Sequence, residues 1–133
     1  MNWKLIFGLS LFGLAMAFAT VYFIPSNVEP YVWLVIFLIC SYFIAKNAPG
    51  KYFLHGFLVC LIDYFWMMGA HIILSKHYIN THTPEAAQYA KMNTDLGLSI
   101  AGAIALISLV IGIISGIVLG LFAFAASKML KKI

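Results

Sequence analysis

An acidic side chain stands in the middle of a long apolar segment of this 133-residue chain. Asp63 is the central residue of the run 52–74. A carboxylate at the centre of a bilayer costs about 2.5–3.5 kcal/mol on insertion scales. The chain has no arginine, and none of its eight lysines lies inside an apolar run. Without a cation as partner, we expect Asp63 to be protonated and to donate a hydrogen bond. Ser108 and Ser115, on the last apolar run, have suitable depth to accept it.

Two interpretations of Asp63 follow, and the sequence leaves both open. An acid inside a membrane span is by default a candidate functional residue, here a proton- or cation-handling group in a transport or channel-type protein. The other interpretation is a neutral carboxyl that joins two helices. The leading functional prediction is a small oligomeric transport or channel-type protein, with the third and fourth spans lining its path and Asp63 as its protonatable group.

Histidines and a carboxylate form a second group of candidates, near the polar segment 75–94. His71, His77, His82 and Glu85 are of the types that bind zinc or copper. Their spacing matches no recognised metal signature, and Pro84 interrupts the local helix. Histidines in a polar loop are the commoner explanation. An outward-facing metal or redox site is therefore the third functional hypothesis.

Motifs of the common enzyme classes are missing from the sequence. It contains no Ser-His-Asp arrangement, phosphate-binding glycine loop or dinucleotide fingerprint. Cys40 and Cys60 lie inside apolar runs and form no CxxC or zinc-type pair. The sequence thus predicts neither catalytic residues nor a cofactor.

The composition requires a membrane environment for the elements that carry these residues. Hydrophobic residues make up 64% of the chain and charged residues 9%, against about 45–50% and about 25% in soluble domains. We predict an all-α integral membrane protein, a single domain over 1–133 that forms a bundle of four transmembrane helices. The expected spans are 5–24, 28–45, 52–74 and 95–126. The first run continues to Ile24, which is the length of a span rather than of a signal-peptide core.

Turn residues separate the expected spans. Pro25 ends the first span and Pro30 suits the first position of the second, while Pro49 and Gly50 form a turn before the third. In the external loop 75–94, Thr83-Pro84-Glu85 predicts the start of a short interfacial helix over about 84–92. Asn93-Thr94-Asp95 predicts another helix start, which opens the fourth span.

The lysines predict the orientation in the membrane. Six of them fall on the side of the two termini: Lys4, Lys46, Lys51, Lys128, Lys131 and Lys132. The other side has only Lys76 and Lys91, offset by Glu29 and Glu85. The positive-inside rule then places both termini in the cytoplasm, with the chain in the cell or bacterial inner membrane. Because the lysines are scattered over loops and ends, we expect no binding to nucleic acid.

Small residues form a stripe on the fourth span. Gly112, Gly116 and Gly120 make two overlapping GxxxG units, which let another helix approach closely. One interpretation is association with an identical chain, or with a larger membrane partner for which this protein is a non-catalytic accessory subunit. The other is packing within the chain against the first or second span, where the first span offers Gly13 and Ala17, four residues apart.

Overall fold

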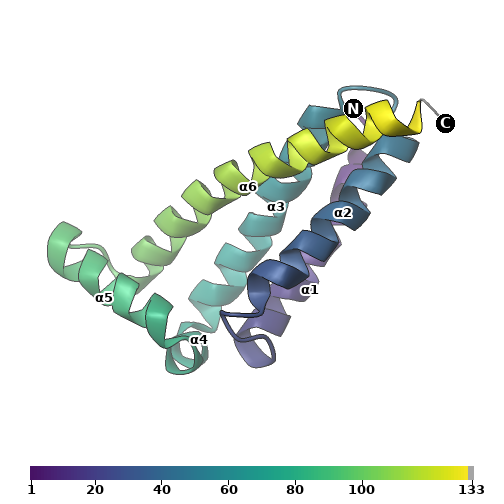
Figure 1. The fold of residues 1–133 in the computed structure, drawn as a ribbon. Coiled ribbons are helices and arrows are strands. Elements are labelled where there is room, and N and C mark those ends of the chain that lie inside the picture. The colour runs from purple at the N-terminus through teal and green to yellow at the C-terminus, as the bar shows by residue number, and fades with distance from the viewer. Residues whose placement is uncertain (132–133) are drawn as a thin grey trace.

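The protein is an assembly of helices in a computed structural model that describes residues 1–131 (Figure 1). Within that range there are six α-helices and no strand: α1 Trp3–Tyr22, α2 Glu29–Asn47, α3 Tyr52–Ile73, α4 Ser75–Thr81, α5 Thr83–Leu96 and α6 Ile100–Leu130. Four of them, α1, α2, α3 and α6, are long and apolar enough to cross a membrane. The predicted all-helical class and four apolar span candidates are confirmed. Lys132, used above for the orientation, lies outside the described residues.

The fourth span candidate begins later and ends later than expected. The predicted helix start at Asn93-Thr94-Asp95 is wrong, because these residues lie in the last turns of α5. Gly97 ends α5 with a left-handed backbone, at φ +66°, which glycine adopts without a steric penalty. Ser99 then caps α6 by accepting a 3.1 Å hydrogen bond from the backbone N–H of Gly102. The resulting 31-residue helix is continuous over about 46 Å.

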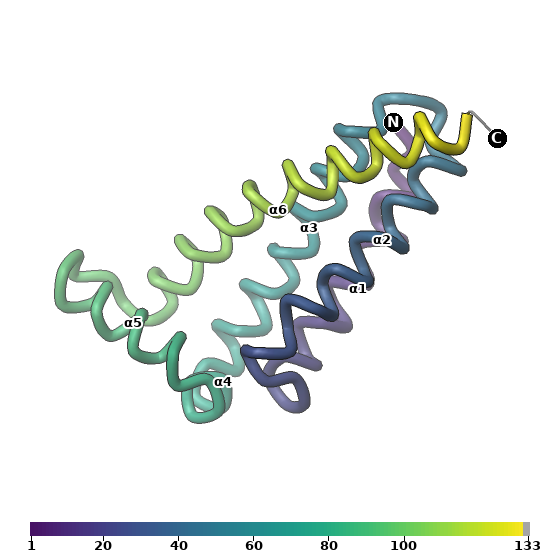
Figure 2. Tube along the Cα trace, viewed as in Figure 1, coloured from purple at the N-terminus to yellow at the C-terminus, as the bar shows by residue number. Residues whose placement is uncertain are grey.

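The polar loop is more helical than its sequence indicated. In place of one short helix over about 84–92, the structure has α4 and the 14-residue α5. Pro84 stands in the first turn of α5, as expected. The N-cap position is held by His82 rather than Thr83, without a side-chain capping hydrogen bond. The two helices lie at the end of the bundle opposite the chain termini (Figure 2).

Helix α3 occupies the centre of the bundle. It packs closely against α6 on one side and α1 on the other, and α2 packs against α6. Figure 1 shows that α2 and α6 lie near each other at the end with the termini and diverge toward α4 and α5. The 48–51 turn lies at the same end as the termini. The arrangement therefore leaves one end of the bundle more open than the other.

The glycine stripe of α6 is covered by α3 of the same chain. Gly112 lies against Tyr64, Gly116 against Phe57 and Gly120 against Phe53. The partner span is thus the third, and not the first or second as the sequence suggested. An identical or foreign chain would have to bind another surface, because α3 occupies this one.

Helix α1 meets α3 through its own small residues. The Cα of Gly13 lies so close to Asp63 that an added Cβ would overlap the Asp63 backbone. Ala17, one turn on, is fully buried in the core. Because the two helices approach so closely, the Asp63 side chain of α3 is fully buried against α1.

Candidate functional site

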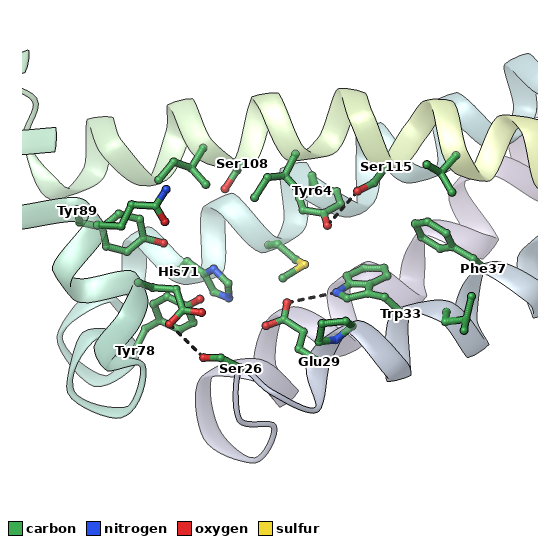
Figure 3. Close-up of a pocket in the computed structure, with 18 of the residues that line it drawn as sticks. Ser26, Glu29, Trp33, Phe37, Tyr64, His71, Tyr78, Tyr89, Ser108 and Ser115 are labelled. Carbon is green, nitrogen blue, oxygen red and sulfur yellow. Dashed lines mark hydrogen bonds between the residues drawn. The ribbon is translucent and has the colours of Figure 1, made fainter. Parts of the chain in front are cut away.

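A cleft of about 540 Å³ lies between α2 and α6. Side chains of α3 form its floor, and α4 and α5 close the end away from the termini, as the close-up shows (Figure 3). Its two ends differ in chemistry. The end near α4 and α5 is polar, with Glu29, Glu85, His71, Tyr78, Gln88 and Tyr89. The rest is mainly apolar, with Leu34, Phe37, Ile111, Val118 and Phe122, and its polar groups are Ser108, Ser115 and the Tyr64 hydroxyl.

Two carboxylates face the polar end, and each is held by a neutral donor. The indole N–H of Trp33 donates to Glu29 Oε1 at 3.3 Å. The hydroxyl of Ser26 donates to Glu85 Oε2 at 3.1 Å. None of the described residues that line the cleft is a lysine or an arginine. The polar end therefore has two acids with no lysine or arginine to offset them.

A stack of three rings supports this end of the cleft. The ring of Tyr78 lies between His71, at 4.0 Å between centroids, and His82, at 4.2 Å. His82 Nε2 also lies 3.3 Å from the backbone oxygen of Ile24, so the stack links α4 to the α1–α2 hairpin. This contact fixes the position of the cap formed by α4 and α5.

The hydrogen bonds of Thr20 favour one tautomer of His71. The hydroxyl of Thr20 donates its one hydrogen to the backbone oxygen of Met16 at 2.8 Å. His71 Nε2 lies 3.0 Å from the same hydroxyl, and it is the donor in that contact when the hydroxyl hydrogen points at Met16. Nδ1 is then left as an acceptor, and it has no partner within residues 1–131. His71 is 5% exposed and points into the cleft (Figure 3).

The residues predicted to bind metal are not brought together. His77 packs on Tyr22, with ring centroids 4.9 Å apart, while His71 and His82 are separated by the Tyr78 ring. Within residues 1–131, no three His, Cys, Asp or Glu side chains are placed where they could share a metal ion. The three histidine rings stack on aromatic neighbours instead of converging on one point.

Asp63 faces away from the predicted serines. Its Oδ1 accepts a 3.1 Å hydrogen bond from the backbone N–H of Gly13. Its Oδ2 is buried and has no partner in the described part of the chain. Ser115 instead donates to the hydroxyl of Tyr64 at 3.4 Å, and Ser108 lines the cleft. The expected Asp63–serine bond is wrong: consecutive helical residues point about 100° apart, and Tyr64 is the one that faces α6.

The sequence did not single out the aromatic residues of the cleft or Glu29. Tyr78 and Tyr89 are ordinary residues of a polar loop, and Glu29 had a sufficient explanation as the residue before Pro30. The sequence offered one indication, which is that acidic residues are rare in this chain. It has only four acids, and two of them line this cleft. Only the fold shows that residues 29 and 85 are neighbours.

The acids of the polar end affect the titration of a nearby tyrosine. Burial, followed by the negative charge of Glu85, raises the pKa of Tyr89 to about 12, against about 10 in an unfolded chain. As the pH rises, the Tyr89 hydroxyl therefore loses its proton at a lower pH in the unfolded state than in the folded state. The contribution of Tyr89 to stability is complete below about pH 10 and is lost as the pH rises through about 12. We expect the ultraviolet difference titration, wild type minus Tyr89→Phe, to show one tyrosinate forming near pH 12. Ionisation near pH 10 would mean that the cap is open to water.

No known protein family, curated protein or solved structure matches this chain.

Proposed function

We propose that this is a small membrane protein that binds one amphipathic molecule in the cleft between α2 and α6. The observation that carries the proposal is the change of chemistry along a cavity of about 540 Å³, from carboxylates at one end to aliphatic and aromatic side chains at the other. Ligand pockets of roughly 300–1,000 Å³ with a few placed polar groups are typical of sites for small molecules.

Residues on the rim of the cleft support access from the lipid. Leu34 of α2 and Ile111 and Val118 of α6 line the cleft and are also exposed on the outside of the helices. In a bilayer this apolar rim would face acyl chains. An amphipathic molecule would enter the cleft laterally from the lipid, between α2 and α6, with its polar group toward α4 and α5.

The orientation in the membrane is part of the proposal. Both termini and the 48–51 turn lie at one end of the bundle (Figure 2), and most of the lysines belong to these segments. By the positive-inside rule we place this end in the cytoplasm of a cell or inner membrane. The polar end of the cleft would then lie in the outer leaflet.

Filling the cleft tests the proposal. Ile111→Trp adds an indole to the wall, so we expect binding of a fluorescent amphiphile in lipid nanodiscs to weaken at least about tenfold, as when a buried contact surface is lost. Ile114→Trp is the matched control, because Ile114 is exposed on the same helix but does not line the cleft. Equal binding by both variants and the wild type would contradict the proposal.

Transport with Asp63 as the proton-handling group is the second candidate function. One specific observation favours it: Oδ2 of Asp63 is buried without a hydrogen-bond partner, which is rare and calls for an explanation. The two spans expected to border a path, α3 and α6, contribute Met67 and Ser108 to the cleft. The transported molecule would thus pass through the cleft, since the glycine contacts leave no room between α3 and α6 themselves.

A further inference from the structure

We infer that the molecule bound in this cleft is a lipophilic amine, with its protonated nitrogen between Glu29 and Glu85 and its apolar part toward Phe37 and Phe122. The inference rests on the proposed function, which it deepens by naming the class of ligand. Charge, aromatic surroundings and one unpaired acceptor support it independently.

The charge of the polar end favours a cation. Glu29 and Glu85 each use one oxygen to accept from Trp33 or Ser26, so the second oxygen of each remains available to a ligand. No lysine or arginine lines the described cleft. An anionic headgroup would meet two carboxylates without a lysine or arginine to neutralise it, whereas an ammonium group would be attracted to both.

Aromatic rings in the cleft also favour a cationic ligand. Trp33 and Tyr64 stack in the cleft with their centroids 5.7 Å apart, and Tyr89 lines its polar end. Both faces of the Tyr78 ring are covered by His71 and His82, so this ring is not open to a ligand. Ring faces attract ammonium groups, with an effect of about 0.5–2 kcal/mol that is larger when the site is shielded from water. They also pack well against the alkyl or aryl part of an amine.

His71 supplies an acceptor that the protein does not use. Its Nε2 is committed to Thr20, and its Nδ1 has no partner within residues 1–131 although the side chain is 5% exposed. A polar atom that is open to a cavity and has no partner in the protein is available to a donor group of a ligand. A protonated amine has such N–H donors, while an ether, a ketone or a quaternary ammonium group has none.

A series of probes with one alkyl chain and different headgroups tests the inference. An alkylammonium, the alcohol and the sulfate are compared by displacement of a neutral fluorescent amphiphile, with the full chain in nanodiscs of zwitterionic lipid. We expect the ammonium to bind at least about tenfold more tightly than the alcohol, as one charge-assisted hydrogen bond allows. The sulfate should bind most weakly.

Replacing one acid at a time then shows which carboxylates cause the preference for the ammonium probe. Glu29→Gln and Glu85→Gln keep the acceptors for Trp33 and Ser26, and each should reduce the ammonium-over-alcohol preference by about tenfold. Asp95→Asn is the matched control, since it removes an exposed acid of α5 that lies outside the cleft. A loss of preference in all three variants would mean that general surface charge attracts the amine, and would overturn the inference.

The remaining outcomes separate the inference from the proposed function. If the alcohol and the ammonium bind equally and Ile111→Trp abolishes both, the cleft binds amphiphiles but the assignment of an amine is wrong. If none of the probes binds to the wild type, the proposed function fails and the inference with it.

Discussion

Gly56→Ala is expected to lower the free energy of unfolding by about 1–3 kcal/mol, the usual cost of overpacking a tight contact. A Cβ at Gly56 would lie 2.7 Å from the backbone oxygen of Leu119 and 2.9 Å from the Cα of Gly120. These are main-chain atoms of α6, so they cannot rotate away as the end of a side chain would. The added methyl group must push α3 and α6 apart along their whole contact.

Gly69→Ala provides the matched control on the same helix. Nothing lies within 4 Å of a Cβ added at Gly69, and alanine is preferred over glycine in a helix by about 1 kcal/mol in water. We expect this variant to be as stable as the wild type or more so. Reversible unfolding in mixtures of mild detergent and dodecyl sulfate, followed by circular dichroism, measures both. Equal stability of the two variants would mean that α3 and α6 do not meet at Gly56.

The position of the spans could be predicted from the sequence because apolar length and chain breakers are local properties. Pro25 and the Pro49-Gly50 pair bound the first three apolar helices close to where they were expected. The start of α6 was misplaced since two good capping signals stand within a few residues, at Asn93 and Ser99. The left-handed backbone at Gly97 ends α5, so that Ser99 and not Asn93 stands before α6. This turn is required because the chain changes direction between α5 and α6.

The contacts between spans were harder to predict. The glycine stripe indicated a close helix contact, but a row of small residues specifies only how near a partner can come. Tyr64 and Phe57 of α3 fill it, and nothing in their residue types indicates this. The same limit applies to the cleft, because Glu29 and Glu85 are far apart in the sequence and meet through the packing of α5 near the α1–α2 hairpin.

Asp63 lies beside the cleft and does not line it, so the carboxyl and the cleft are two separate features of α3. Tyr64 and Met67 of α3 line the cleft, while Asp63 is buried against Gly13 of α1. A ligand in the cleft therefore does not touch the carboxyl.

Asp63→Leu is expected to raise the free energy of unfolding by about 1–3 kcal/mol, which is the cost of burying a polar group without a partner. Leucine has the same branching as aspartate, with a methyl group in place of each carboxyl oxygen. It removes Oδ2, which has no hydrogen-bond partner among the described residues. The Gly13 N–H that now donates to Oδ1 at 3.1 Å stands in the middle of α1, where the helix supplies its own acceptor.

Asp63→Asn separates the effect of the side chain's shape on stability from the effect of its carboxyl proton. Asparagine keeps the acceptor for Gly13 but has no exchangeable carboxyl proton, and we expect its stability to stay within about 1 kcal/mol of the wild type, the scale of one hydrogen bond. The infrared pH titration in bilayers, wild type minus Asp63→Asn, then reports whether the carboxyl exchanges its proton while the protein stays folded. A more stable leucine variant together with a titrating band would mean that the acid is kept at a cost for proton handling. A leucine variant less stable than the wild type would contradict this, and would identify the Asp63–Gly13 contact as the bond that holds α1 against α3.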